Sequence, residues 1–259
     1  MELTNKNIIL TGASSGIGYT LAKLFAREKC NLALLARRKN ILDSLANELK
    51  IFGNKIIPIE CDVSQKESVA RAYSQIKESL GEIDIAILNS GVSYRMRIEE
   101  FDSSKGEKIF GANFMGIVYF VEQLLPDFIK NRKGTIVGVS SLADSRGYPR
   151  STFYSASKAA ATKFLESLRL ELKKYNIKVI TIKPGFVRTP MTDKNEFFMP
   201  FLIDVEKAAK IILKGIKKEK RIIQFPFPIV LGSKFLSIIP DSFYDFLMSK
   251  QLPSKKINK

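Results

Sequence analysis

Tyr154 and Lys158 stand four residues apart in the stretch STFYSASK, residues 151–158. At this spacing a helix carries both side chains on one face, so the phenol and the ammonium group can lie side by side. A phenol has a pKa of about 10 and is a poor base at neutral pH, but a neighbouring positive charge favours its ionised form. We therefore expect Tyr154 to transfer a proton and Lys158 to lower its pKa. The alternative is an amphipathic helix whose Tyr and Lys only face solvent.

The chain of 259 residues contains no histidine. This excludes Ser-His-Asp triads, Cys-His dyads and zinc sites with histidine ligands. The two cysteines, Cys30 and Cys61, lie at the edges of apolar runs and are expected to fill the core, so no metal site is predicted. Acid/base chemistry must then use Tyr, Lys, Asp, Glu or water.

The elements that would position these residues alternate along the chain. Short runs rich in Ile, Val and Leu occur at 7–10, 31–36, 55–61, 83–89, 134–140 and 178–182, with a weaker seventh at 221–225, and such runs are typical of buried parallel strands. Helical periodicity covers 16–29, 40–51, 65–80, 104–131, 154–175 and 206–218. This alternation predicts an α/β fold, a Rossmann-like doubly wound parallel sheet of about seven strands flanked by helices.

No repeat or linker interrupts the pattern, so a single nucleotide-binding domain is predicted for 1–259. Its core would cover about 5–190, a substrate lid and an apolar C-terminal segment about 190–250, and a basic tail 251–259. The start of the chain shows no signal-peptide pattern, and two cysteines cannot form a disulfide framework. We therefore expect a cytoplasmic protein.

Three glycines follow the first predicted strand, in the stretch TGASSGIG. Glycine lets the backbone approach a pyrophosphate, and the N-terminus of the following helix offers N–H donors and the positive end of its dipole. The spacing is GxxxGxG rather than the commoner GxGxxG. A dinucleotide is predicted to bind here, at Gly12, Ser14, Ser15, Gly16, Ile17 and Gly18.

The end of the second predicted strand distinguishes the two nicotinamide cofactors. NAD sites usually place an acidic residue there to bind the ribose hydroxyls, whereas this strand ends in Arg37 and Arg38, with no acid before Asp43. A guanidinium group binds a 2′-phosphate that a carboxylate would repel. This predicts NADP(H) rather than NAD(H); the alternative is that both arginines only face solvent.

Turns after the next two strands also suit a nucleotide. Asp62 could accept a hydrogen bond from the adenine amino group, and Val63 could pack on its ring. The small residues Asn89, Ser90 and Gly91 follow the fourth strand. Open α/β sheets bind ligands at the carboxyl ends of their strands, so we expect all three to contact the cofactor.

Seven motifs together resemble the short-chain dehydrogenase/reductase family: TGASSGIG, CDV, LNSG, GANFMG, VSS, YSASK and PGFVRT. They stand in the order and spacing of that family over about residues 5–190, and only the serine of NSG departs from its commoner NAG. The resemblance implies a catalytic set of Asn113, Ser141, Tyr154 and Lys158. In this set Ser141 holds the substrate oxygen and Asn113 positions a water as a proton relay.

The resemblance also assigns roles to residues of the stretch KPGFVRT, which follows the sixth strand. It implies that Pro184 and Gly185 form a turn, and that the Val187 backbone and the Thr189 hydroxyl hold the carboxamide of the nicotinamide. Substrate specificity would depend on the residues after Thr189, where MTDKNEFFMPFLI has the polar and then apolar character of a mobile lid. By resemblance we also expect a homo-oligomer, a dimer or tetramer formed through the fourth and fifth helices.

The combined prediction is an oxidoreductase acting on CH-OH groups, which transfers a hydride between NADP(H) and a carbonyl or alcohol substrate. The apolar segment 225–248 is too interrupted by prolines and charges to span a bilayer. Its apolar face could pack on the core or on a neighbouring subunit, line a channel for an apolar substrate, or make peripheral membrane contact through residues Ile229 to Met248. An apolar substrate would be a ketone, an aldehyde, a sterol or a long-chain acyl-type compound.

Two alternative functions would involve binding without catalysis. The net charge is +16, and residues 205–259 hold 12 Lys or Arg against four Asp or Glu. Such a charge could indicate a nucleic-acid or membrane-surface binding protein, but no basic motif interleaved with aromatic residues accompanies it, and no nucleic-acid partner is predicted. The other alternative is a catalytically silent NADP(H)-binding sensor, against which the complete Asn–Ser–Tyr–Lys set argues.

Overall fold

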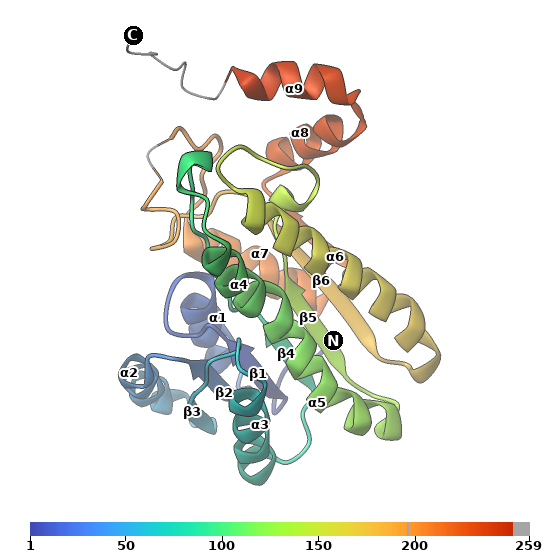
Figure 1. Cartoon of the computed structure of the whole chain (residues 1–259). Helices are drawn as coiled ribbons and strands as arrows, with labels where there is room; N and C mark the ends of the chain where they lie inside the picture. Colours follow the sequence, from blue (N-terminus) through green and yellow to red (C-terminus); the bar gives the residue numbers. More distant parts are fainter. Residues whose placement is uncertain (196, 251–259) are drawn as a thin grey trace.

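Seven parallel strands form one sheet at the centre of the protein, in the order β3-β2-β1-β4-β5-β6-β7 (Figure 1). The computed structural model describes residues 1–195 and 197–250, so the predicted basic tail, 251–259, lies outside the described residues. The strands are β1 Asn7–Thr11, β2 Asn31–Ala36, β3 Ile56–Glu60, β4 Ile85–Leu88, β5 Thr135–Val139, β6 Lys178–Pro184 and β7 Ile222–Phe225. The predicted fold class is confirmed, including the weaker seventh strand. The assignment of 1–259 to a single domain stays a prediction.

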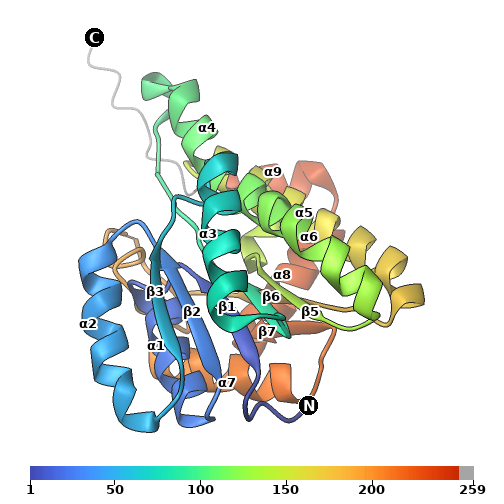
Figure 2. The ribbon, with the colours of Figure 1, turned by 90° about the horizontal axis from the view of Figure 1, so that it is seen from below.

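Each strand has apolar side chains on both faces because helices cover both sides of the sheet. Ile8 and Leu10 point to one core and Ile9 to the other, as the two-residue period of a strand requires. Helices α1, α2 and α7 cover the first face, and α3, α5 and α6 the second (Figure 2). Their bounds are α1 Gly16–Arg27, α2 Lys39–Leu49, α3 Lys66–Leu80, α5 Gly116–Asn131, α6 Thr152–Leu172 and α7 Val205–Lys217.

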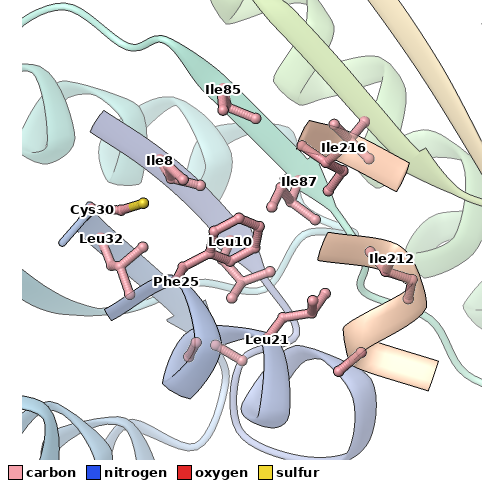
Figure 3. Packing of buried hydrophobic residues seen from close by; sticks show 14 of the residues in the cluster. Ile8, Leu10, Leu21, Phe25, Cys30, Leu32, Ile85, Ile87, Ile212 and Ile216 are labelled. Carbon is pink, nitrogen blue, oxygen red and sulfur yellow. The ribbon is translucent and has the colours of Figure 1, made fainter. Parts of the chain in front are cut away.

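The first core joins elements that are far apart in the sequence. Phe25 of α1 lies against Leu10 of β1, and Ile212 and Ile216 of α7 close the same cluster (Figure 3). Phe25 and Ile212 are fully buried. Burying side chains of this size contributes about 1.5–3 kcal/mol each, so this packing holds β1, and the glycine turn after it, in a fixed place.

The long fourth helix differs from the prediction. One regular helix was expected over 104–131, but the structure has α4 Ser103–Phe110, a π-helical segment η3 Gly111–Met115 and then α5. A π-turn widens the helix by one residue and is frequent at functional sites. Among the described residues, the run Ser103–Asn131 is the one helix long and apolar enough to cross a membrane. Here its second half packs against α3 and the sheet, as the core helix of a globular protein does.

Two further helices follow the sheet. These are α8 Phe227–Ile238 and α9 Asp241–Ser249, which lie beyond the carboxyl ends of the strands at the top of Figure 1. Short 3-10 turns complete the described secondary structure: η1 Lys50–Phe52, η2 Ile98–Glu100, η4 Leu142–Asp144 and η5 Lys173–Tyr175. The predicted lid, after β6, forms irregular turns apart from a single bridge between Val187 and Ile203.

The close contact between β5 and α6 depends on a glycine. A Cβ at Gly138 would lie 2.3 Å from Cδ1 of Leu165, and Leu165 is fully buried. The missing side chain therefore lets α6 approach the strand whose end leads into Ser140 and Ser141.

We expect Gly138→Ala to lower the free energy of unfolding by about 1–3 kcal/mol, because the added methyl overpacks this contact. Urea denaturation of the purified proteins would measure it. The matched control is Gly147→Ala, since a Cβ there meets no atom within 4 Å. Equal stability of the two variants would contradict the proposed contact.

Candidate functional site

A cleft of about 600 Å³ opens at the carboxyl ends of the strands. Its walls come from both sides of the point where the strand order reverses between β1 and β4, which is where open α/β sheets bind ligands. Every predicted cofactor and catalytic residue lines this cleft except Gly18 and Asn113. The lining residues among those predicted are Gly12, Ser14, Ser15, Gly16, Ile17, Arg37, Arg38, Asp62, Val63, Asn89, Ser90, Gly91, Ser141, Tyr154, Lys158, Pro184, Gly185, Val187 and Thr189.

The glycine turn is built by backbone geometry and close packing. Gly12 and Gly16 have φ values of +68° and +54°, a left-handed conformation that glycine adopts without strain. Gly18 lies behind the turn, where a Cβ would come within 2.3 Å of the Gly12 carbonyl oxygen. Its missing side chain lets α1 begin close against the turn. The first turn of α1 carries no acidic residue, so no carboxylate opposes an anion at this helix end.

Asn89 ties the glycine turn to the end of β4. Its Nδ2 donates to the Thr11 carbonyl oxygen at 3.0 Å, and its backbone N–H donates to Thr11 Oγ1 at 2.9 Å. The Ser90 N–H donates to the same hydroxyl oxygen at 3.0 Å. Sequence reasoning missed Thr11, which is almost fully buried. Thr11 is the first residue of the TGASSGIG motif, and this place in the motif is the signal that could have identified it.

Arg38 lies across the glycine turn. Its Nε and Nη2 donate to Ser14 Oγ at 3.2 and 2.9 Å, and Nη2 also donates to the Ser14 carbonyl oxygen at 3.2 Å. The side chain is exposed at the edge of the cleft. Arg37 lines the same cleft and a neighbouring hollow that contains Glu60 and Asp62. A guanidinium group and a hydroxyl thus share one corner of the cleft, as suits a phosphate group.

One carboxylate oxygen of Asp62 is used in hydrogen bonds within the protein. Its Oδ1 accepts hydrogen bonds from the Ser64 backbone at 3.0 Å and from the Ser64 hydroxyl at 2.8 Å. This arrangement is a local Asx turn of the kind that aspartate favours. The turn presents the half-buried Asp62 and the buried Val63 to the cleft, where both were expected.

Lys158 is buried between α6 and β5. Its Nζ donates to the Val139 carbonyl oxygen at 2.9 Å and lies 5.8 Å from the centre of the Tyr154 ring. Burial lowers the pKa of Lys158 from 10.5 to about 8, while the Asp144 carboxylate acts in the opposite direction. The other protons of the ammonium group remain for partners in the cleft, which Lys158 lines.

Tyr154 is half-buried at the start of α6. Desolvation raises the pKa of its phenol, the Ser141 hydroxyl lowers it through a hydrogen bond, and the Asp144 carboxylate raises it. The net shift of the Tyr154 pKa is thus upward, and Lys158 is not among its causes. The ammonium group is directed at the Val139 carbonyl oxygen, and the lowering of the Tyr154 pKa by Lys158 stays a prediction.

The two neighbouring serines of the VSS motif have different surroundings. The Ser140 hydroxyl donates to the Lys158 carbonyl oxygen at 2.8 Å and accepts from Thr162 Oγ1 at 2.7 Å. Ser141 Oγ accepts from the Ala143 N–H at 3.1 Å and has the Pro184 carbonyl oxygen at 3.5 Å. Both serines line the cleft, but the Ser140 hydroxyl is used inside the protein, whereas the Ser141 hydroxyl lies beside Tyr154.

Asn113 lies behind the cleft wall in the π-helical segment and is fully buried. Its Oδ1 accepts from the Val92 N–H at 2.7 Å, and its Nδ2 donates to the Val92 carbonyl oxygen and to Ser157 Oγ, each at 3.0 Å. A Cβ at Gly91 would lie 3.2 Å from Asn113 Oδ1 and 3.4 Å from Lys158 Nζ. Asn113 therefore holds the 91–92 turn against α6 and stands next to the lysine.

Several residues of the site were not predicted. Lys108 of α4 lines the cleft, and no motif marks it. Met191 also lines the cleft; it is the first residue of the predicted lid, but it was not named as a site residue. Asp144 is buried behind Tyr154, where its Oδ2 accepts from Thr162 Oγ1 at 2.5 Å and pairs with Lys183 Nζ at 2.8 Å. Its Oδ1 has no hydrogen-bond partner. The sequence carries no signal for this charge, because the pairing joins α6, β6 and η4.

The donor set fits a nicotinamide dinucleotide. One end of the cleft offers the glycine turn, Ser14 and Arg38 for phosphate groups, and the other offers Tyr154 and Lys158. The volume of the cleft lies within the range of known ligand sites. Asp62 is the one Asp or Glu among the described residues that line the cleft.

Comparison with known proteins agrees with this geometry. The family model described as short chain dehydrogenase matches residues 6–197. An uncharacterized oxidoreductase of Myxococcus xanthus is 31% identical over 244 residues, which cover 94% of this chain and 96% of that protein. The 3-oxoacyl-[acyl-carrier-protein] reductase FabG of Thermotoga maritima is 33% identical over 199 residues, covering 75% of this chain and 79% of that protein.

Solved structures have the same fold. A short-chain dehydrogenase from Sphingobium yanoikuyae in complex with NADPH has a TM-score of 0.81 at 25% identity and covers 98% of this chain and 99% of its own. A short chain dehydrogenase/reductase from Burkholderia phymatum in complex with NAD has a TM-score of 0.84 at 20% identity and covers 100% of both chains. The family model spans well over half of the chain. The protein is therefore an oxidoreductase that belongs to the short-chain dehydrogenase/reductase family.

Proposed function

We propose that this protein reduces a carbonyl group with NADPH, or oxidises the corresponding alcohol with NADP⁺. The observation that carries the proposal is the meeting of the Tyr154 phenol, the Ser141 hydroxyl and the Lys158 ammonium group at one end of the cleft. The glycine turn and Arg38 stand at the other end. Pure nucleotide binding would not require a tyrosine hydrogen-bonded to a serine at this point, which disfavours a silent sensor.

Each residue of this set has a distinct proposed role. The bound dinucleotide supplies or accepts the hydride. The Ser141 hydroxyl holds the substrate oxygen, and the Tyr154 phenol gives that oxygen its proton during reduction. Lys158, as an ammonium group, stabilises negative charge on the phenol after the proton has left. Asn113 holds the turn beside Lys158, and its expected role in positioning a relay water belongs to the same proposal.

The preference for NADP(H) over NAD(H) rests on Arg38 and Ser14. Charge-assisted hydrogen bonds from a guanidinium group are strong and suit a phosphate. The Arg38–Ser14 contact sets both groups at the edge of the cleft before any ligand binds. The Sphingobium yanoikuyae relative in complex with NADPH supports the preference; the relative in complex with NAD is similar at the level of the fold.

The proposed substrate is an apolar carbonyl compound. Met191, Phe198 and Phe201 of the lid segment are exposed, and Met191 lines the cleft. The Thermotoga maritima relative is a 3-oxoacyl-[acyl-carrier-protein] reductase. A long-chain acyl-type ketone would cover such apolar surface. The cytoplasmic location and the homo-oligomer stay predictions.

Tyr154→Phe should lower kcat for carbonyl reduction roughly 100- to 10,000-fold, because it removes the proton donor, while NADPH binding is retained. The measurement is NADPH oxidation over ketones and aldehydes of graded chain length, with NADPH affinity measured by fluorescence. Tyr148→Phe is the matched control, since Tyr148 is half-buried nearby but does not line the cleft. Equal rates in wild type and Tyr154→Phe would assign the activity to another group.

Arg38→Ala should weaken NADPH binding about 10- to 100-fold and leave NADH binding nearly unchanged, because only NADPH carries the 2′-phosphate. Titration of both cofactors by calorimetry measures the two affinities. Lys39→Ala is the control, since Lys39 pairs with Asp43 on α2. A uniform loss for both cofactors would contradict the preference.

Lys158→Met should change how stability depends on pH. The pKa of Lys158 falls from 10.5 to about 8 in the folded protein, so between these values the unfolded chain binds more protons and stability rises with pH. Relative to Lys158→Met, the wild type should gain on the order of 3 kcal/mol across that window. Urea denaturation from pH 7 to 10.5 measures it, with the exposed Lys207→Met as control. Parallel pH profiles would mean that the ammonium group is hydrated.

A further inference from the structure

Helix α8 has its apolar side chains on the outside. Phe227, Leu231, Phe235 and Ile238 are 75%, 60%, 55% and 79% exposed, and their spacing of four, four and three residues places them on one face. On the opposite face the polar Ser233 is buried, with its hydroxyl 2.9 Å from Ser145 Oγ. Val230 is buried as well, so α8 carries apolar side chains on its water-exposed face in addition to the packed one. We call the four exposed residues the α8 stripe.

Helix α8, which carries the α8 stripe, is held against the rest of the protein by hydrogen bonds at its end. Arg146 donates to the Leu236 carbonyl oxygen at 2.9 Å and to the Ile239 carbonyl oxygen at 2.5 Å, and it pairs with Asp241 at 2.6 Å. The Tyr244 hydroxyl donates to the Gly147 carbonyl oxygen at 2.5 Å. These bonds attach the turn between α8 and α9 to the loop after η4, so the stripe belongs to the folded body.

Other exposed apolar residues lie at the same end of the molecule. Phe198 of the lid segment is 87% exposed and Ile98 of η2 is 73% exposed. In Figure 1 both segments rise at the top, with α8 and α9, beyond the carboxyl ends of the strands. Met191 and Tyr94, from these same two segments, line the cleft. The α8 stripe, Phe198 and Ile98 therefore lie on segments at the same end of the molecule, and we call these exposed residues together the apolar rim.

We propose that the apolar rim docks on the surface of an anionic phospholipid membrane. Helix α8 has 12 residues, which extend about 18 Å, too short to cross a hydrocarbon core of about 30 Å. A helix of this kind can lie in the interface with its apolar face among the acyl chains. Exposed apolar surface of this extent marks an interaction site in a water-soluble fold.

Charge favours a lipid surface over a second copy of the chain. Residues 226–259 hold five lysines and two aspartates, and one of the aspartates, Asp241, pairs with Arg146. The Lys250 ammonium group lies 4.2 Å from the ring centre of Phe246 at the end of α9. A second copy docked through this segment would bring the same lysines against one another, whereas anionic headgroups attract lysines at about 1 kcal/mol each.

Docking in this orientation would turn the mouth of the cleft toward the lipid. An apolar carbonyl substrate dissolved in the bilayer could then enter without crossing water. This second step rests on the proposed function, whereas docking itself does not.

The test is flotation of the full-length protein with phosphatidylcholine vesicles and with vesicles that also contain phosphatidylglycerol. We expect wild type to float with the anionic vesicles, less with phosphatidylcholine alone, and less as salt is raised. The double variant Leu231→Glu/Phe235→Glu should bind at least 10-fold more weakly, because each apolar side chain removed from lipid loses a large transfer free energy. Ile51→Glu is the matched control, since Ile51 is 81% exposed on η1 after α2, away from the rim.

Circular dichroism and NADPH binding show whether each variant is folded, and neither depends on catalysis. No flotation of the wild type, or equal flotation of wild type and double variant, would overturn the proposal. Sedimentation velocity tests whether a second copy of the chain covers the rim instead. If the wild type is a dimer, and the double variant is a monomer that still binds vesicles equally well, the rim belongs to a dimer interface. A failure of Tyr154→Phe to lower activity would leave the flotation result standing, so the two proposals fail separately.

Discussion

The Lys158 ammonium group is held inside the protein by the carbonyl oxygen of Val139, at 2.9 Å. This bond exists only because α6 lies close against β5, where Gly138 leaves room for Leu165. The approach brings α6 over the end of β5, so that Tyr154 and Ser141 meet at one place. A buried amine is costly as an ion. The site therefore keeps a positive charge ready beside the cleft at the expense of stability.

The cleft joins two halves of the sheet that are far apart in the sequence. One half provides the glycine turn after β1 and the arginines after β2, and the other provides Ser141 after β5 and Tyr154 on α6. The halves meet because the strand order reverses between β1 and β4. Hydrogen bonds between Asn89 and Thr11 join the end of β4 to the end of β1 at this point. Phosphate groups and a reacting carbonyl can thus occupy one continuous groove.

The segments that carry the apolar rim lie beyond the carboxyl ends of the strands, where the cleft opens. The sheet and its six flanking helices bury their apolar side chains against one another in two cores. The exposed residues of α8 are therefore not needed to complete either core. Arg146, through its bonds to the α8–α9 turn, holds this surface in place. This arrangement agrees with the proposed apolar substrate, which would be poorly soluble in water.

The amino-acid sequence by itself determined the seven strands and the glycine turn, because strand and helix periodicity and turn chemistry are local properties. Most of the cleft residues followed from motifs and from the resemblance to the family, whereas Lys108 was missed. It also indicated Ser141 rather than Ser140 by resemblance, and the structure assigns Ser140 to a contact with the Lys158 backbone. Only the tertiary structure decided the π-helical segment around Asn113, the buried Asp144–Lys183 pair and the raised pKa of Tyr154. Each of these depends on burial and on distances between elements far apart in the chain, and spacing along a sequence carries no information about either.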